Sequence, residues 1–148
     1  MKYATREEMK KAHEKEMNSF PIVFAFSDKQ FEEGIREKWG MTNTSKRNLE
    51  KICSIGMGGY ILKADTEKYL EMLKRFTREE KEFNADFREL VKTIKAEMYN
   101  YEYTYSPHDA DDYVREAVNH LSDHPRFEEA YAKARREVLK KAGYEGIA

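Results

Sequence analysis

His120, Asp123 and His124 are the residues whose types and spacing come closest to a catalytic metal site in this sequence. Imidazole nitrogens and carboxylate oxygens are common zinc ligands, and two histidines four residues apart on one helix can bind the same ion. Pro125, however, disfavours helical backbone at the residue before it, so His124 is expected to precede a new helix rather than share one with His120. A metal-dependent hydrolase or nuclease that uses His120, His124 and nearby carboxylates is therefore an alternative hypothesis and not the preferred one.

The segment GMGG at 56–59 and the lone Cys53 each have a chemical and a structural interpretation. Phosphate-binding glycine loops lead directly into a helix, whose N-terminus holds the anion. The strand-like YILK follows here instead, which predicts a hairpin turn. Cys53 lies in an apolar strand with no adjacent basic residue to activate it, and is expected to be a buried, unreactive thiol. The sequence thus assigns no catalytic residue, no metal ligand and no cofactor.

Four tyrosines occupy alternate positions of the segment MYNYEYTYS: Tyr99, Tyr101, Tyr103 and Tyr105. In an extended segment this alternation places all four rings on one side, and tyrosine and threonine both favour strands. We therefore expect a short strand or extended connector over 100–105. The rings either cover the sheet or the long helix, or they form a contact surface, since tyrosine is enriched at binding hot spots. Base stacking is disfavoured, because the segment carries Glu102 and no lysine or arginine.

The balance of charge disfavours a general nucleic-acid binder. Lysine plus arginine number 27 against 28 aspartate plus glutamate, a net charge of −1, so no overall basic field would hold a polyanion. The last helical segment nevertheless contains KARREVLKK, in which Arg135 and Arg136 give a basic outer face. Direct nucleic-acid binding by this helix is a second alternative. The preferred hypothesis assigns Arg135 and Arg136 to partner binding, together with Glu102 and the four tyrosines.

The composition indicates one folded domain over residues 1–148, a common domain size. Although 37% of the residues are charged, 13% are aromatic, which disfavours a disordered chain. A single cysteine excludes an internal disulfide and suits a reducing cytosol. Without a signal-peptide pattern or an apolar run of about 20 residues, we expect a soluble cytoplasmic protein that does not enter a membrane.

Apolar patterns and capping signals position the candidate residues in a helix-dominated α+β fold. The continuous apolar run 20–26 predicts a strand covered on both faces, and 51–63 predicts a β-hairpin around its glycines. Together they form a small antiparallel sheet, which 100–105 could extend. A capping box at Ser27 begins the next helix, and Gly40 ends it.

Helical spacing accounts for the remaining segments. A polar helix over 1–18 has a thin apolar stripe, so we expect it to dock loosely. Apolar residues at steps of three and four predict one long helix over 66–98, preferred over two helices with a break near Thr77. Pro107 and Pro125 each begin a C-terminal helix.

Two segments resemble a family of small uncharacterised proteins carried by bacteriophages and mobile elements. The first is FPIVFAFSDKQFEEG running into KICSIGMGGYILKAD, residues 20–65, and the second is MYNYEYTYSPHDADD, residues 98–112. The matching motifs are a strand leading into a capped helix, a glycine hairpin and a tyrosine-rich segment. The resemblance implies a shared fold and a mobile-element origin, and it implies no known reaction.

The preferred functional hypothesis is a non-enzymatic accessory protein of a phage or mobile element. Such proteins, anti-CRISPR inhibitors among them, are commonly small, highly charged single domains that act by binding, although this is an analogy of class. We expect binding to a host protein complex, for example a CRISPR–Cas nuclease or its ribonucleoprotein, whose activity is inhibited or modulated. The identity of the partner and the oligomeric state stay open at this point.

Overall fold

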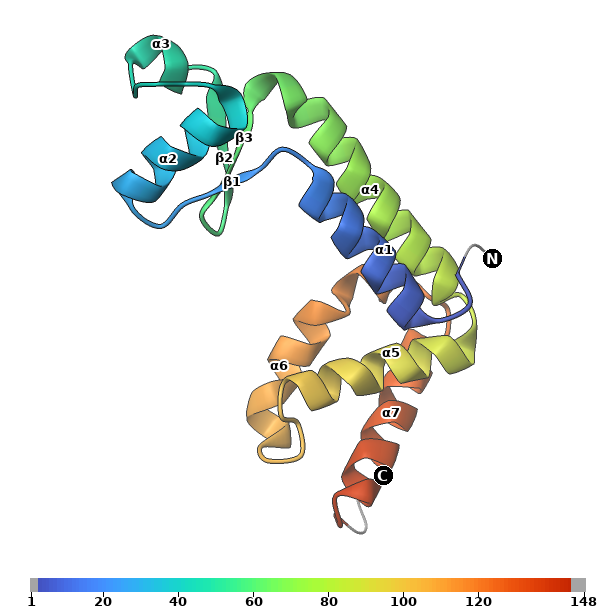
Figure 1. Cartoon of the computed structure of the whole chain (residues 1–148). Helices are drawn as coiled ribbons and strands as arrows, with labels where there is room; N and C mark the ends of the chain where they lie inside the picture. Colours follow the sequence, from blue (N-terminus) through green and yellow to red (C-terminus); the bar gives the residue numbers. More distant parts are fainter. Residues whose placement is uncertain (1–2, 145–148) are drawn as a thin grey trace. The chain divides into compact units, whose positions relative to one another are not determined.

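The computed structural model describes residues 3–144, which fold into seven α-helices and a small antiparallel sheet (Figure 1). This architecture confirms the predicted helix-dominated α+β class.

The chain divides into two compact units. The sheet unit spans Lys10–Arg75, and the helical unit comprises the described residues up to Met9 together with those from Phe76 onward. The boundary falls inside two helices, α1 (Arg6–Ser19) and α4 (Thr66–Phe83). The single domain expected from the chain length stays a prediction.

The polar N-terminal helix expected over 1–18 is α1. In the helical unit, Met9 is fully buried and the Arg6 guanidinium lies 3.0 Å from a carboxylate oxygen of Glu97. In the sheet unit, Glu16 pairs with Arg75. The loose docking of this helix stays a prediction.

Three short strands form the sheet: β1 (Val23–Phe24), β2 (Ile52–Gly56) and β3 (Gly59–Leu62). They lie in the order β1-β3-β2, with both pairs antiparallel. The predicted hairpin over 51–63 is therefore confirmed. Its turn needs left-handed backbone at three successive positions, of which two are glycines and one is Met57, at φ 51°.

The strand predicted over 20–26 is shorter than expected and lies at a sheet edge. Within the described residues, β1 has β3 as its one neighbouring strand. The side chains of Phe24 and Phe26 are 61% and 80% exposed, so the expectation of a strand covered on both faces is wrong. One face is nevertheless closely packed, because α2 (Asp28–Trp39) lies against β1. A Cβ at Gly34 of α2 would meet Val23 Cγ1 at 2.5 Å, so glycine permits this close approach.

The ends of α2 follow the predicted signals. Gln30 N donates to Ser27 Oγ at 3.2 Å, and the Gln30 side-chain oxygen accepts from Phe26 N at 2.8 Å, which completes the capping box. Gly40 ends the helix in the left-handed conformation. The polar segment that follows contains the short helix α3 (Lys46–Leu49).

The long helix predicted over 66–98 is wrong, because the chain breaks between α4 and α5 (Phe87–Asn100). Asp86 caps α5 by accepting from Arg88 N at 2.8 Å and Glu89 N at 3.3 Å. Asn84, buried at the break, accepts from Thr93 Oγ1 at 2.7 Å. Asp86 thus satisfies backbone N–H groups that a continuous helix would have paired with its own carbonyls, and both side chains place the break well after Thr77.

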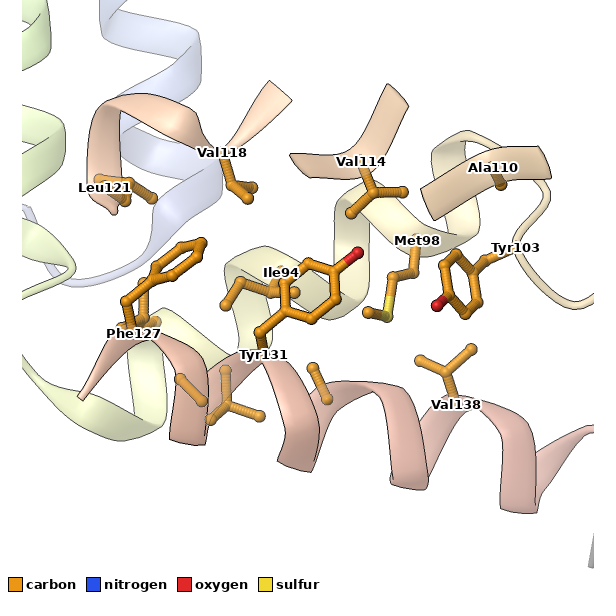
Figure 2. Packing of buried hydrophobic residues seen from close by; sticks show 14 of the residues in the cluster. Ile94, Met98, Tyr103, Ala110, Val114, Val118, Leu121, Phe127, Tyr131 and Val138 are labelled. Atoms are coloured by element: carbon orange, nitrogen blue, oxygen red, sulfur yellow. The ribbon is translucent and has the colours of Figure 1, made fainter. Parts of the chain in front are cut away.

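The core of the helical unit lies between α5, α6 (Pro107–Ala117) and α7 (Phe127–Lys141), as Figure 2 shows. The side chains packed there are mainly aliphatic, with ring contributions from Tyr103, Phe127 and Tyr131. The short 3₁₀ turn Asn119–Leu121 leads from α6 towards α7 and buries Leu121. Both C-terminal helices predicted from sequence are confirmed.

The strand predicted over 100–105 is wrong, because this segment is the C-terminal cap of α5. Glu102 N donates to Tyr99 O at 3.2 Å, and Tyr103 N donates to Met98 O at 2.9 Å. These two bonds, with Glu102 in the left-handed conformation at φ 53°, form a Schellman motif. Glycine usually occupies the left-handed position of this motif, but here the residue is Glu102, so the sequence gives no signal for the turn.

Candidate functional site

The cap of α5 sends the four tyrosine rings in different directions. Tyr103 is 1% exposed and belongs to the core, whereas Tyr105 is 83% exposed. Tyr99 and Tyr101 are partly exposed. The single tyrosine face expected from sequence is therefore wrong: one ring is structural and three lie at the surface.

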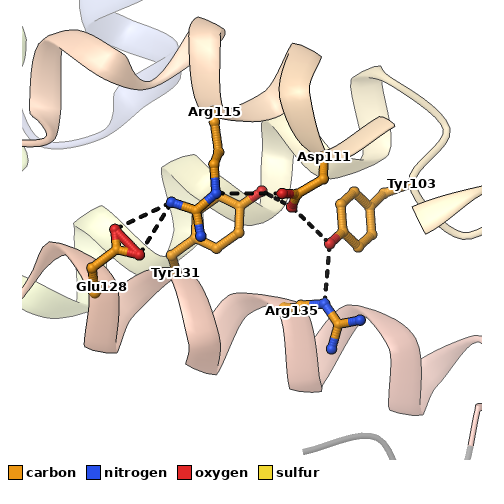
Figure 3. A network of polar contacts seen from close by, with 6 residues as sticks. All are labelled: Tyr103, Asp111, Arg115, Glu128, Tyr131 and Arg135. Atoms are coloured by element: carbon orange, nitrogen blue, oxygen red, sulfur yellow. Dashed lines mark hydrogen bonds and ion pairs between the residues drawn. The ribbon is translucent and has the colours of Figure 1, made fainter. Parts of the chain in front are cut away.

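The buried Tyr103 belongs to a polar network centred on Asp111 of α6 (Figure 3). The hydroxyl of Tyr131 lies 2.5 Å from Asp111 Oδ1, and the hydroxyl of Tyr103 lies 3.0 Å from the same oxygen. Arg115 Nε lies 3.4 Å from Asp111 Oδ2. Arg135 Nε in turn donates to the hydroxyl oxygen of Tyr103 at 3.1 Å. We call these five residues the Asp111 clasp; it ties α6, α7 and the cap of α5 together.

The surroundings of Asp111, Tyr103 and Tyr131 fix the protonation states of these three clasp residues. Burial by itself would raise the pKa of the Asp111 carboxyl, but the hydrogen bonds from Tyr131 and Tyr103 and the charge of Arg115 hold that pKa below its usual value. Burial, together with the carboxylate beside them, raises the pKa of Tyr131 and of Tyr103. Near neutral pH the carboxylate therefore accepts and both phenols donate.

Arg115 extends the clasp to Glu128 at the start of α7. Its Nη1 lies 3.1 Å and 3.2 Å from the two Glu128 carboxylate oxygens, and its Cζ lies 4.0 Å from the ring centroid of Tyr131. Burial would lower the pKa of the Arg115 guanidinium, but the hydrogen bond and charge of Glu128 raise it. The arginine is thus held by two carboxylates and one aromatic face.

An open groove of about 1170 Å³ runs along this network. Its lining includes five acidic residues and two arginines: Asp109, Asp111, Asp112, Glu116 and Glu128, with Arg115 and Arg135. Both arginines take part in the clasp. Asp112 and Glu116 form no ion pair within residues 3–144, and together with Asp109 they recur at helical spacing on one face of α6. The groove is therefore acidic after its internal pairs are formed.

Exposed aromatic rings lie next to this acidic face. Tyr113 lines the groove and is more than half exposed. Its ring stacks on that of Tyr101, with centroids 6.1 Å apart and planes 13° apart. The stacked pair offers rigid aromatic area that the core of the unit does not use.

His120 and His124, the two histidines of the metal-site hypothesis, contact different residues. His120 Nε2 lies 3.3 Å from a Glu80 carboxylate oxygen. His124 Nδ1 accepts from Arg126 N at 3.0 Å, and its Nε2 lies 2.9 Å from the carbonyl oxygen of Ala85, which identifies Nε2 as the protonated nitrogen. Across residues 3–144, no three His, Cys, Asp or Glu side chains are grouped so as to hold a metal ion.

The other residues singled out from sequence are distributed over both units. Arg135 joins the clasp through Tyr103, while Arg136 is exposed on α7. Glu102 holds the left-handed cap position. In the sheet unit, Cys53 is partly buried, with its sulfur 3.7 Å from Thr66 Oγ1. Of the residues assigned to partner binding, the structure thus places Tyr101 beside the groove, and Tyr103 and Arg135 in the clasp.

Sequence reasoning missed three residues that build the site: Asp111, Arg115 and Tyr113. The spacing of Asp111 and Arg115 is a readable signal, since aspartate and arginine four residues apart on a helix can pair. The two phenols that complete the clasp come from 8 residues before and 20 residues after Asp111, and no local pattern connects them.

The fold and the groove together define a small, helix-dominated α+β protein with an acidic, tyrosine-rich surface. Residues 5–137 match a protein family described as a family of unknown function, DUF7659, and the chain belongs to this family. The match includes the whole sheet unit, the helical unit as far as residue 137 and all of the clasp. No curated protein and no solved structure matches the chain. Within the described part, no helix is long and apolar enough to cross a membrane.

Proposed function

We propose that this protein acts by binding rather than by catalysis, and that its groove takes a lysine- or arginine-bearing segment of a partner protein. The observation that carries this proposal is the acidic face of α6. Asp112 and Glu116 form no ion pair within residues 3–144. The stacked rings of Tyr101 and Tyr113 lie beside them.

A cationic side chain matches each feature of this surface. Lysine and arginine pair with exposed carboxylates, and they also lie favourably over the faces of tyrosine rings. Arg115 already makes this contact inside the protein, between the Glu128 carboxylate and the Tyr131 ring. A partner cation over Tyr113 would repeat the same chemistry at the surface.

The state of Asp111 also favours binding over acid–base catalysis. A general base that works near neutral pH needs a pKa near that pH. The pKa of Asp111 is lowered, and its lone pairs accept from two phenols and a guanidinium. The most buried carboxylate of the groove therefore serves to hold the surface in shape.

The more specific form of the proposal concerns origin and partner. The motifs of 20–65 and 98–112 support a phage or mobile-element protein that binds a host complex and inhibits or modulates it. A CRISPR–Cas nuclease is a fitting partner, since such enzymes hold nucleic acid in a positively charged channel that an acidic groove would match.

Titration of a fluorescently labelled basic peptide, followed by anisotropy at low and moderate salt, tests the general proposal. The double variant Asp112→Asn/Glu116→Gln should bind about tenfold more weakly, because two exposed ion pairs contribute roughly 0.5–1 kcal/mol each. The matched control Glu32→Gln/Glu33→Gln removes the same charge from exposed positions of α2 and should bind as the parent does. Equal weakening in both variants would show a diffuse charge effect and refute a binding groove.

Affinity purification from host lysate, followed by mass spectrometry and sizing of the recovered complex, tests the specific proposal. A basic protein or ribonucleoprotein should be recovered with the parent and lost with Asp112→Asn/Glu116→Gln. Failure to recover any stable partner at micromolar concentration would count against a host-complex inhibitor.

A further inference from the structure

The sheet unit contains a second, chemically different pocket. It has a volume of about 530 Å³, within the roughly 300–1,000 Å³ typical of small-molecule sites. Its apolar lining comes from the end of α2 and the residues just after it, and from the end of β3 and the turn that follows: Trp39, Met41, Leu62 and Ala64. Glu50, Lys51 and Lys63 complete the lining and are exposed to solvent.

The backbone on both sides of this pocket is fixed by hydrogen bonds. After α2 ends at Gly40, Met41 N donates to Ile35 O at 3.1 Å, which holds Met41 against the helix. On the other side, Lys63 N donates to Lys51 O at 2.8 Å and keeps the two lysine positions together. The walls are therefore formed before any ligand arrives, which lowers the entropy lost on binding.

The charged residues of the lining indicate the chemistry of the occupant. Lys51 and Lys63 make no ion pair in the part of the chain that the structure describes, and only Glu50 opposes their charge. An apolar wall beside two ammonium groups fits an apolar molecule that ends in a carboxylate.

We propose that this pocket binds a small apolar carboxylate, with its hydrocarbon part against Trp39, Met41 and Leu62 and its carboxylate at Lys51 and Lys63. This inference is independent of the groove in the helical unit, because the two sites share no residue.

Trp39 is the sole tryptophan of the chain, so intrinsic fluorescence reports on this pocket directly. We would titrate the protein with octanoate, with octanol as the apolar control and with acetate as the charged control. Octanoate should give a saturable change in Trp39 emission, octanol should bind about tenfold more weakly, and acetate should have no effect at the same concentrations.

Two variants separate the charged from the apolar contribution. Lys51→Gln/Lys63→Gln should weaken octanoate binding about tenfold and leave octanol binding unchanged. Lys29→Gln/Lys68→Gln, which removes two exposed lysines of the same unit outside the pocket, should bind octanoate as the parent does. The proposal is overturned if octanoate produces no saturable change, if octanol binds as tightly as octanoate, or if the two lysine pairs behave alike.

Discussion

Replacing Asp111 by alanine removes the acceptor at the centre of the clasp. The hydroxyls of Tyr131 and Tyr103, both on nearly fully buried side chains, lose the carboxylate oxygen to which they donate. Hydrogen bonds to a charged group contribute about 1.5–3 kcal/mol each, which gives roughly 3–6 kcal/mol for the pair. The Asp111 side chain is 34% exposed, so water replaces part of what is lost. We therefore expect Asp111→Ala to lower the free energy of unfolding by about 3 kcal/mol.

Chemical and thermal unfolding, followed by far-ultraviolet circular dichroism, measures this loss. For a chain of this length, 3 kcal/mol corresponds to a decrease in Tm of about 6–12 °C. Asp112→Ala is the matched control: it removes the same charge from the next position of α6, where the side chain is exposed and makes no clasp contact. That control should change the unfolding free energy by less than about 0.5 kcal/mol.

A double-mutant cycle with Tyr131→Phe isolates the shortest hydrogen bond of the clasp. The coupling free energy between Asp111→Ala and Tyr131→Phe should be about 1–2 kcal/mol, since the two side chains share that bond. If Asp111→Ala and Asp112→Ala destabilise the protein equally, or if the cycle gives no coupling, the clasp does not stabilise the helical unit as argued.

Three further outcomes follow from single positions. Glu102→Gly should raise the urea midpoint, with a gain of about 1 kcal/mol, because glycine adopts the left-handed cap without strain; a lower midpoint would contradict this. Gly34→Ala should lower Tm, because the new Cβ would meet Val23 Cγ1 at 2.5 Å. The clash should cost about 1–3 kcal/mol, which outweighs the gain in helix propensity of about 1 kcal/mol. An unchanged Tm would show that β1 moves to make room for the methyl group. Since the pKa of Asp111 is lowered and that of Tyr131 is raised on folding, stability from the clasp is lost as pH falls below about 4 or rises above about 10. Urea unfolding at several pH values should show the parent and Asp111→Ala converging at both extremes, and a constant difference would contradict the assigned charge states.

Local signals in the sequence predicted the elements that depend on neighbouring residues. The capping box at Ser27, the glycine end of α2 and the hairpin over 51–63 are all formed by contacts within a few positions of the chain. Each is confirmed, because its energy comes from hydrogen bonds and backbone conformations that a short window of sequence contains.

The elements that were predicted wrongly are those in which a local capping signal conflicts with the apolar spacing, or in which the usual capping residue is missing. The apolar spacing over 66–98 continues across the break, and the cap by Asp86, which accepts from Arg88 N and Glu89 N, shows that side-chain capping outweighed it. Apolar spacing also counts Tyr113 as part of the buried face of α6, although its ring is exposed. The tyrosine alternation led to a wrong strand prediction for a related reason. The Schellman motif has Glu102 where glycine is usual, so the sequence contains no glycine that would indicate the turn.

The clasp and the proposed binding surface use different side chains of the same helix, which makes their roles separable. Asp111 and Arg115 point their polar atoms at Tyr103, Tyr131 and Glu128, so changing them alters stability first. Asp112 and Glu116 make no ion pair within residues 3–144, so changing them leaves the internal hydrogen bonds of the clasp in place. Loss of partner binding in Asp112→Asn/Glu116→Gln at unchanged Tm would therefore locate function on the outer face of α6. If the double variant loses partner binding and also has a lower Tm, Asp112 and Glu116 have a structural role instead.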